Sequence, residues 1–309
     1  MTVIVCVYNA GRWLRPAVLS VLGQTHRRLQ VIVIDDGSTD GCMETIADLG
    51  DPRIETIRQP RNAGKPVALN RALAATRGEF YALHDADDIS HPLRIERLVG
   101  CMRERPGLAA VFSGYDLLID NRPRAPFLNA KDEAACADDI AHFRIPSQDP
   151  TVMYRTAIAR QYPYAEDLPV VEGLDHVLRV GEHHPLRVLG ECLYSYRIHP
   201  HQITRRSPAD RERLVRDVMR RACLRRGIPF VEGAAADRGS ANDIRENYIA
   251  SHFISSVLDL RRLRRRIDAL RTGWFCSLLH PADPVYHKAL IYALAPESVI
   301  PLMRRKTHA

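Results

Sequence analysis

The sequence lacks the features that would place the chain in a membrane or on a secretory route. No stretch of its 309 residues approaches the roughly 18 uninterrupted apolar residues that a membrane-spanning helix needs. Its first nine residues read directly into a strand, without the charged and apolar regions of a signal peptide. We therefore expect a cytoplasmic protein.

Paired cysteines are also missing. The seven cysteines lie far apart and form neither a C-x-x-C pair nor the Cys/His spacing of a zinc site. We expect them to be reduced, buried and structural. The sequence contains no internal repeat, no low-complexity tract and no Gly-rich phosphate loop near its first strand. The missing loop argues against a sugar nucleotidyltransferase.

The overall composition is that of an ordinary globular protein. Apolar residues make up 46% of the chain and charged residues 26%, a balance that can bury a substantial core. The length suggests one large domain plus an appendage, or two domains. A formal charge of +7 favours anionic partners such as nucleotide phosphates or a lipid surface. No recognised nucleic-acid-binding module accompanies this charge, so we expect no nucleic-acid partner.

The first third of the chain alternates strand-like and helix-like segments, which predicts an α/β fold with a mostly parallel central sheet flanked by helices. Strands are expected at residues 2–7, 30–34, 54–58 and 79–83, and helices at 13–23, 42–49 and 66–75. Ser90 should cap a helix at 92–103, followed by strands at 109–112 and 115–119 and by loops and short helices over 121–149. Ligands of such sheets bind at the carboxyl ends of the strands.

Beyond about residue 204 the composition changes to an Arg-rich helical region. Helices are expected at residues 210–226 and 241–271. The stretch from Leu260 to Arg271 carries an apolar stripe under a strongly basic face. Two interpretations stay open: a solvated helix packed on the main domain, or peripheral contact with an anionic membrane.

Acidic residues follow one of the predicted strands directly, as Asp85-Ala86-Asp87-Asp88. Two carboxylates one residue apart at a strand end can both reach a hard divalent cation, whose remaining ligands are diphosphate oxygens and water. Without a metal, the crowded carboxylates would repel one another and the diphosphate. The alternative is a polar turn that caps the next helix.

Three further strand ends carry residues suited to a nucleotide. Asp35 or Asp36 can accept the N–H of a uracil-like base and the hydroxyls of ribose, and Gly37 allows a tight turn beside them. Tyr8 offers a stacking face, and Lys65 can neutralise phosphate charge. Each residue alone is more often structural, but four ligand-competent strand ends in one sheet favour a nucleotide-binding site.

At these positions the sequence resembles the family-2 glycosyltransferases, whose nucleotide-sugar-binding fold is called GT-A. The ordered matches are Val5-Cys6-Val7-Tyr8-Asn9-Ala10, Ser20-Val21-Leu22-Gly23-Gln24-Thr25, Val33-Ile34-Asp35-Asp36-Gly37-Ser38-Thr39-Asp40, Asn62-Ala63-Gly64-Lys65 with Asn70, Gly78-Glu79-Phe80, Asp85-Ala86-Asp87-Asp88, and Tyr196-Arg197-Ile198-His199 with Gln202. They cover roughly the first 205 residues. The resemblance implies an inverting enzyme that uses a nucleotide sugar.

The resemblance also implies roles for individual residues. The nucleotide-sugar-binding residues would be Val7, Tyr8, Asn9, Asp35, Asp36, Lys65, Asp85, Ala86, Asp87 and Arg197. A divalent metal, Mn²⁺ or Mg²⁺, would be held by Asp85, Asp87 and His199. His199 has an equally plausible role in hydrogen bonding within its loop.

The sequence departs from the family pattern at one functional position. Family members usually carry a Glu-Asp pair ahead of a helix that ends in Leu-Arg, and the Asp commonly serves as the base. Here the pair reads Glu172-Gly173. We predict Glu172 as the base and Asp175 as the second candidate, and Asp149 is a further carboxylate that could act.

Together these observations predict a metal-dependent, inverting glycosyltransferase. It would move a sugar from a nucleotide diphosphate, such as UDP, to a glycan or lipid-linked acceptor of bacterial surface polysaccharide. A nucleotide-sugar-binding protein without transfer activity is the alternative, because Gly173 cannot act as a base. We expect a GT-A domain over residues 1–205, with nucleotide-sugar binding at about 1–110 and the acceptor side at about 111–205, and a helical region over 206–309.

Overall fold

The computed structural model of the chain describes residues 1–199, 208–231, 248–296 and 300. Gln202, which was matched together with the Tyr196–His199 segment, lies outside the described residues. So does the start of the helix expected at residues 241–271.

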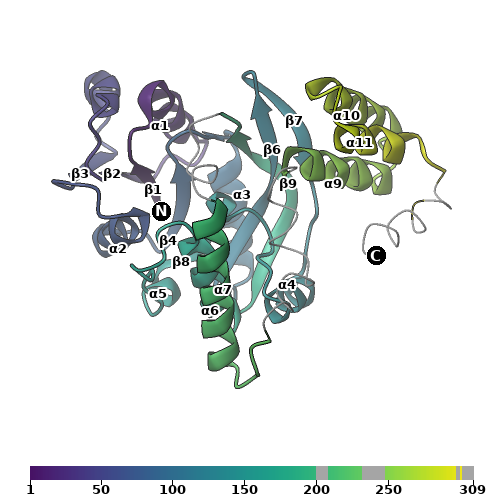
Figure 1. The fold of residues 1–309 in the computed structure, drawn as a ribbon. Helices are drawn as coiled ribbons and strands as arrows, with labels where there is room; N and C mark the ends of the chain where they lie inside the picture. The colour runs from purple at the N-terminus through teal and green to yellow at the C-terminus, as the bar shows by residue number, and fades with distance from the viewer. Residues whose placement is uncertain (200–207, 232–247, 297–299, 301–309) are drawn as a thin grey trace.

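A nine-stranded sheet forms the centre of the protein (Figure 1). Four parallel strands make up one half, in the order β3 (Ile54–Arg58), β2 (Gln30–Asp35), β1 (Thr2–Val7) and β4 (Phe80–Asp85). Their register pairs Val7 with Asp35 and Cys6 with Asp85. The carboxyl ends of β1, β2 and β4 therefore meet at one edge of the sheet.

The other half of the sheet is mixed in direction. It contains β8 (Met153–Arg155), β6 (Ala110–Ile119), β9 (Leu186–Arg197), β5 (Ile89–Ser90) and β7 (Arg122–Phe127). The short strand β5 follows β4 almost at once and pairs antiparallel with the end of β9. This pairing brings the end of β9 beside the acidic segment that follows β4.

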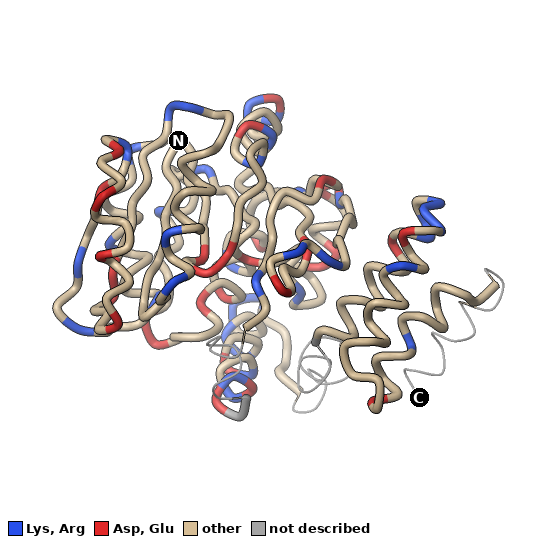
Figure 2. The backbone as a smooth tube through the Cα atoms, turned by 90° about the horizontal axis from the view of Figure 1, so that it is seen from above, with Lys and Arg blue, Asp and Glu red and all other residues tan. Residues whose placement is uncertain are grey.

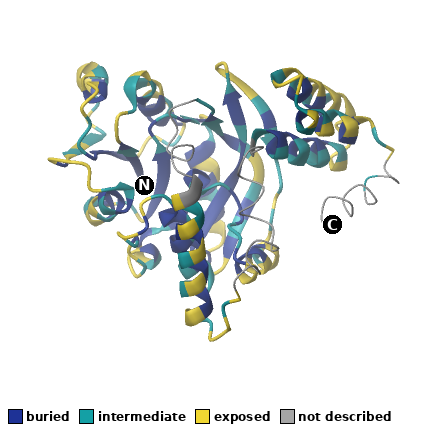
Figure 3. Cartoon of the chain, viewed as in Figure 1, coloured by how far each residue is buried: buried dark blue, intermediate teal, exposed yellow. Residues whose placement is uncertain are grey.

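Helices cover both faces of the sheet because alternate residues of each strand point to opposite faces. One face packs against α2 (Lys65–Ala75), α4 (Glu133–Ala141), α6 (Glu172–Gly181) and α7 (Pro208–Arg225), and the other against α1 (Leu14–Leu22), α3 (Arg94–Glu104) and the 3₁₀ segment η2 (Cys42–Leu49). In β1, Ile4 faces the first layer and Val3 and Val5 face the second. Figure 3 shows the strands buried between these layers.

A helical bundle packs on β6, β7 and β9, at the end of the sheet opposite β3 (Figure 1). It consists of α9 (Tyr248–Arg262), α10 (Arg266–Leu279) and α11 (Pro284–Leu294). Phe253 and Val257 of α9 share an apolar cluster with Tyr115 and Leu117 of β6. Within the described residues, no helix combines the length and the apolar character needed to cross a membrane.

The predicted α/β architecture is confirmed, but three local expectations are wrong. The segment at 122–127 forms a strand, β7, where loops were expected, and Pro123 and Pro126 obscure it in the sequence. Proline is tolerated here because β7 pairs with β6 alone. The expected Ser90 cap is also absent, since α3 starts at Arg94 and the Ser90 hydroxyl accepts a hydrogen bond from the Arg94 side chain at 3.0 Å.

The long helix expected at 241–271 is interrupted. Arg264 adopts a left-handed conformation with φ of 60°, and the Arg265 amide donates to the Leu260 carbonyl at 2.8 Å. This hydrogen bond closes the carboxyl end of α9 in the manner of a Schellman turn. The basic stretch is therefore divided between the end of α9, a tight turn and the start of α10.

Candidate active site

The loops after β1 and β2 are tied together at the carboxyl edge of the sheet. The side-chain oxygen of Asn9 accepts a hydrogen bond from the backbone amide of Thr39 at 2.8 Å, and the backbone amide of Asn9 donates to the Ser38 hydroxyl at 3.0 Å. Asp35 is buried and accepts from the Ser38 amide at 2.8 Å. Tyr8 stands beside these loops with 38% of its surface exposed. Its ring is accessible at the edge where a flat base was predicted to stack.

Asp36 organises the loop that leads into α2. Its carboxylate accepts hydrogen bonds from the Gln59 side chain at 2.6 Å and from the amides of Ala63 and Gly64 at 2.8 and 2.9 Å. These contacts fix the start of α2, where Lys65 is the first residue. Asp36 thus positions Lys65, a role that its place in the sequence motif did not indicate.

Gly37 lets two backbone segments approach at this loop. Its φ is 76°, and a Cβ added there would lie 2.6 Å from the Arg61 carbonyl carbon and 2.7 Å from the Asn62 nitrogen. No side chain fits in that space. The tight turn predicted at Gly37 is therefore confirmed.

Lys65 lies among three carboxylates, and we call Lys65, Asp85, Asp149 and Glu172 the Lys65 cluster. The Lys65 ammonium is 2.9 Å from Oδ1 of Asp85 and 3.4 Å from Oε1 of Glu172. Burial disfavours the charge on Lys65, but the attraction of Asp85, Glu172 and Asp149 outweighs it and raises the lysine pKa well above its usual value. The lysine therefore remains charged at neutral pH.

Two acids of the Lys65 cluster hold their protons more tightly than exposed acids do. Burial raises the pKa of Asp149 to about 7; the charges of Glu172 and Asp85 add to this effect, and Lys65 opposes it. Burial also raises the pKa of Glu172, again against the influence of Lys65. A group that gains or loses a proton near neutral pH, as Asp149 does, is suited to proton transfer.

The acidic segment after β4 is locked to the end of β9. The Arg197 amide donates to Oδ1 of the buried Asp88 at 2.8 Å, and Nε of Arg197 donates to the Asp87 carbonyl at 2.7 Å. Nε2 of His199 lies 2.8 Å from Oδ2 of Asp87. The structure thus brings Asp87 beside Arg197 and His199, which lie far from it in the sequence.

Trp13 supports this arrangement from the other side. The Arg197 guanidinium lies 4.3 Å from the centre of the Trp13 ring, and the rings of Trp13 and His199 are 5.8 Å apart. A cation over an indole face is attracted by the ring electrons. This contact could not be predicted from the sequence, where Trp13 is read only as the start of a helix.

The residues around Asp87 fit a metal ion that is shared with a diphosphate. No group of three or more His, Cys, Asp or Glu side chains in the described ranges is placed to hold an ion alone. The side chains of Asp87 and His199 are adjacent, and Asp85 lies beside Lys65 at the end of β4. Mg²⁺ and similar ions are commonly bound by one or two carboxylates, with phosphate oxygens and water as the other ligands.

Asp175 contributes to the packing of α6 against α7. It is 2% exposed, its Oδ2 lies 2.7 Å from Nε of Arg179, and its Oδ1 lies 3.8 Å from a guanidinium nitrogen of Arg225. Its two ion pairs are thus with arginines of α6 and α7, whereas Glu172 pairs with Lys65. The catalytic roles predicted for Glu172 and Asp175 remain predictions.

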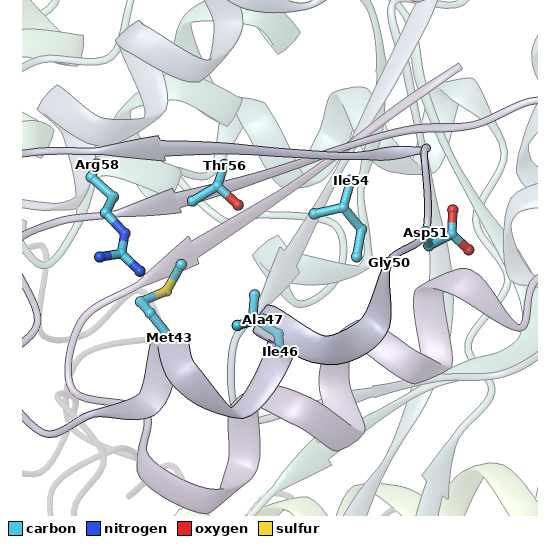
Figure 4. Close-up of a pocket in the computed structure, with 8 residues that line it drawn as sticks. All are labelled: Met43, Ile46, Ala47, Gly50, Asp51, Ile54, Thr56 and Arg58. Atoms are coloured by element: carbon cyan, nitrogen blue, oxygen red, sulfur yellow. The ribbon is translucent and has the colours of Figure 1, made fainter.

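A hollow of about 320 Å³ lies at the β3 edge of the sheet, away from these residues (Figure 4). It is lined by Met43, Ile46, Ala47, Gly50, Asp51, Ile54, Thr56 and Arg58. None of the predicted site residues borders it, and we assign it no role.

A sequence model described as "Glycosyl transferase family 2" matches residues 2–161, which contain the strand ends of the site. The chain belongs to this family. Its membership confirms the resemblance found in the sequence.

Solved structures with the same fold include two glycosyltransferases. Residues 1–349 of TarS from S. aureus, solved in complex with UDP-GlcNAc, are 17% identical to this chain, with a TM-score of 0.61 over 98% of this chain and 91% of that chain. The mannosyltransferase PcManGT from Pyrobaculum calidifontis, solved with GDP-Man and Mn²⁺, is 16% identical, with a TM-score of 0.57 over 95% and 84%. At these identities the likeness shows the GT-A fold.

Curated relatives match over part of their length. The succinoglycan biosynthesis protein ExoO from Rhizobium meliloti is 33% identical over 121 residues, which is 39% of this chain and 32% of that protein. Three other relatives are matched over 66%, 31% and 56% of their own lengths. The chain thus spans less than two thirds of these relatives.

Replacing Asp149 tests the burial of its carboxyl group. Because its pKa rises from 3.8 to about 7 on folding, ionisation of Asp149 destabilises the folded state as pH increases through this interval. Asp149→Asn removes that penalty. The free energy of unfolding of the variant minus that of the unchanged protein should therefore be larger at pH 7.5 than at pH 4.5, by up to about 3 kcal/mol. Urea unfolding at both pH values measures the difference.

Asp138→Asn provides the control, because the Asp138 side chain is 63% exposed on α4. A stability difference between Asp149→Asn and the unchanged protein that is equal at the two pH values would contradict the effect of burial on Asp149.

Proposed function

We propose that this protein is a metal-dependent, inverting glycosyltransferase that uses a uridine diphosphate sugar. Its acceptor is a glycan or a lipid-linked glycan, and its product belongs to bacterial surface polysaccharide. The observation that carries the proposal is the meeting of Lys65–Asp85 and Asp87–His199 at the strand ends that also hold Tyr8 and Asp35. These groups match the phosphate, metal and base of a nucleotide sugar.

The nucleoside part of the donor would bind at the ends of β1 and β2. Tyr8 supplies a ring for stacking, and the predicted acceptor of a pyrimidine imide N–H is Asp35 or Asp36. Since the Asp36 carboxylate already accepts three hydrogen bonds from its loop, Asp35 is the better placed of the two. The proposed preference for uridine is supported by the TarS complex with UDP-GlcNAc, whereas PcManGT was solved with GDP-Man.

Asp85, Asp87 and His199 would hold the divalent ion. When bound, such an ion stabilises the negative charge that develops on the departing diphosphate. The Lys65 ammonium, held at the end of β4 by Asp85, adds positive charge on the protein side. The support for a metal is the Asp87–His199 pair together with the Mn²⁺ complex of PcManGT.

The transfer itself would be a single in-line displacement. The acceptor oxygen attacks the anomeric carbon while the bond from that carbon to the diphosphate breaks, so the configuration inverts. A carboxylate receives the proton of the acceptor hydroxyl. Glu172 and Asp175 are the residues predicted for this role from the sequence.

A nucleotide-sugar-binding protein without transfer activity is the second candidate. Gly173 favours it, because the family usually has an acid at this position. The three carboxylates around Lys65 favour transfer, since the site retains acids near the donor-binding edge. Release of free nucleoside diphosphate from the sugar donor distinguishes the two, because only a transferase or hydrolase produces it.

Asp87→Ala tests the metal site. The change removes the carboxylate that contacts His199, so Mn²⁺ should no longer increase UDP affinity and turnover should fall by at least about 10²-fold. Calorimetry of UDP binding with and without Mn²⁺ measures the first effect, and UDP release measures the second. Asp48→Ala, an exposed surface acid, is the matched control. Metal-dependent UDP affinity that survives in Asp87→Ala would refute the assignment.

We also propose that the helical bundle contacts an anionic membrane surface. Exposed apolar residues of α10 recur at helical spacing, namely Ile267, Leu270, Trp274 and Leu278. Arg264, Arg265, Arg266 and Arg271 are exposed in the same region, and Figure 2 shows basic residues gathered at one end of the bundle. An apolar helix face bordered by arginines suits the boundary between lipid headgroups and acyl chains.

Sedimentation with lipid vesicles tests this surface. The protein should bind phosphatidylglycerol vesicles and not phosphatidylcholine vesicles, and binding should fall as salt rises. Arg264→Gln combined with Arg271→Gln should weaken binding roughly tenfold or more, since each arginine contributes about 1 kcal/mol near such a surface. Trp274→Ala should also weaken it, whereas Leu224→Ala, an exposed apolar residue of α7, should not. Equal binding to both lipids would contradict the proposal.

A further inference from the structure

The carboxylate of Asp149 occupies the space beside Gly173. A Cβ added at Gly173 would lie within 3.0 Å of Cγ and both carboxylate oxygens of Asp149, and 2.8 Å from Oδ1. Any side chain at position 173 would therefore displace that carboxylate. The φ of Gly173 lies outside the left-handed region that favours glycine. The need for glycine at this position therefore comes from its close packing against Asp149.

The backbone that carries Asp149 is firmly held. Asp149 opens the 3₁₀ segment η3 (Asp149–Thr151), whose Pro150 carbonyl accepts a hydrogen bond from the Arg94 guanidinium at 2.6 Å. Arg94 is fully buried and also donates to the Leu83 carbonyl of β4 at 2.9 Å. One arginine thus links η3 to the strand that leads into the acidic segment. A carboxylate on such a support has a fixed position, as a proton acceptor requires.

Asp149 differs from the other two candidate acids in its bonding. Oδ1 of Asp149 is buried and has no hydrogen-bond partner within the described part of the chain. Glu172 is engaged by Lys65, and Asp175 by Arg179 and Arg225. A buried carboxylate oxygen without a partner is costly in a folded protein, and such groups are often found where a ligand binds.

We propose that Asp149 is the general base of the transfer reaction and that Gly173 leaves the space in which its carboxylate sits. This inference rests on the proposed function. The acid that the family pattern places at position 173 is then supplied from another element, η3, at nearly the same point in space. Asp149 takes the role that the sequence favoured for Glu172.

The step is balanced without any further reactant. The acceptor O–H bond breaks and its proton passes to the Asp149 carboxylate, while the acceptor oxygen forms a bond to the anomeric carbon. The bond between that carbon and the diphosphate oxygen breaks, and its electron pair stays on the diphosphate. A carboxyl group with a pKa of about 7 suits this step, because it is ionised in part at neutral pH and still holds a transferred proton.

Moving the carboxylate back to position 173 tests the proposal. Asp149→Asn and Asp149→Ala should lower turnover by about 10²–10⁴-fold, while UDP affinity in Mn²⁺ stays within about twofold. Adding Gly173→Asp to Asp149→Ala should raise turnover at least tenfold above that of Asp149→Ala alone, because the new side chain enters the vacated space. Turnover is measured as UDP release from UDP-GlcNAc, UDP-glucose and UDP-galactose, with water as the acceptor.

Glu172→Gln is the matched control, because Glu172 is a buried acid of the same Lys65 cluster. Its loss of turnover should be at least tenfold smaller than that of Asp149→Asn. Near-normal turnover in Asp149→Asn would overturn the assignment, as would a folded double variant no faster than Asp149→Ala. If the double variant does not fold, the isosteric Asp149→Asn decides alone. If the unchanged protein neither binds UDP nor releases it from a sugar donor, the proposed function is contradicted. If the unchanged protein and the Asp149→Asn variant are both active, only the role of Asp149 is contradicted.

Discussion

The ion pairs of Lys65 with Asp85 and Glu172 hold the acidic side chains of the site together. Three carboxylates approach one another at the end of β4 and the start of α6, and they would repel one another without a cation between them. Lys65 supplies that cation at the first residue of α2. Its position is fixed by Asp36, whose carboxylate holds the two residues before the lysine. The proposed binding of a diphosphate would call for further positive charge, which the proposed metal beside Asp87 would supply.

Residues from several elements of the fold gather at the carboxyl edge of the parallel strands. Parallel pairing of β1, β2 and β4 brings Tyr8, Asp35 and Asp85 to one side. The return of β9 adds Arg197 and His199 to the segment after β4. The 3₁₀ segment η3 brings Asp149 beside Gly173 of α6. The positions proposed for the donor, the metal and the base thus come from elements that are distant in sequence and adjacent in space.

The sequence predicted those features that depend on local pattern. Apolar runs such as Val31–Ile34 identify buried strands, and the acids that follow them identify the edge where ligands bind. What it could not predict depends on contacts between distant segments. The proximity of Asp149 to Gly173 and the stacking of Arg197 on Trp13 leave no mark on the local sequence. The edge strand β7 was missed because two prolines normally exclude a strand, and only its position at the margin permits them.

Nucleoside diphosphate release across a panel of nucleotide sugars tests whether the protein is a metal-dependent transferase with a pyrimidine-nucleotide donor. The purified chain is incubated with UDP-, TDP-, GDP- and ADP-sugars, with Mn²⁺ or with a chelator. We predict release from a UDP- or TDP-sugar in the presence of Mn²⁺ and its loss with the chelator. Release that is indifferent to the chelator, a preference for a GDP-sugar, or no release from any donor would contradict it.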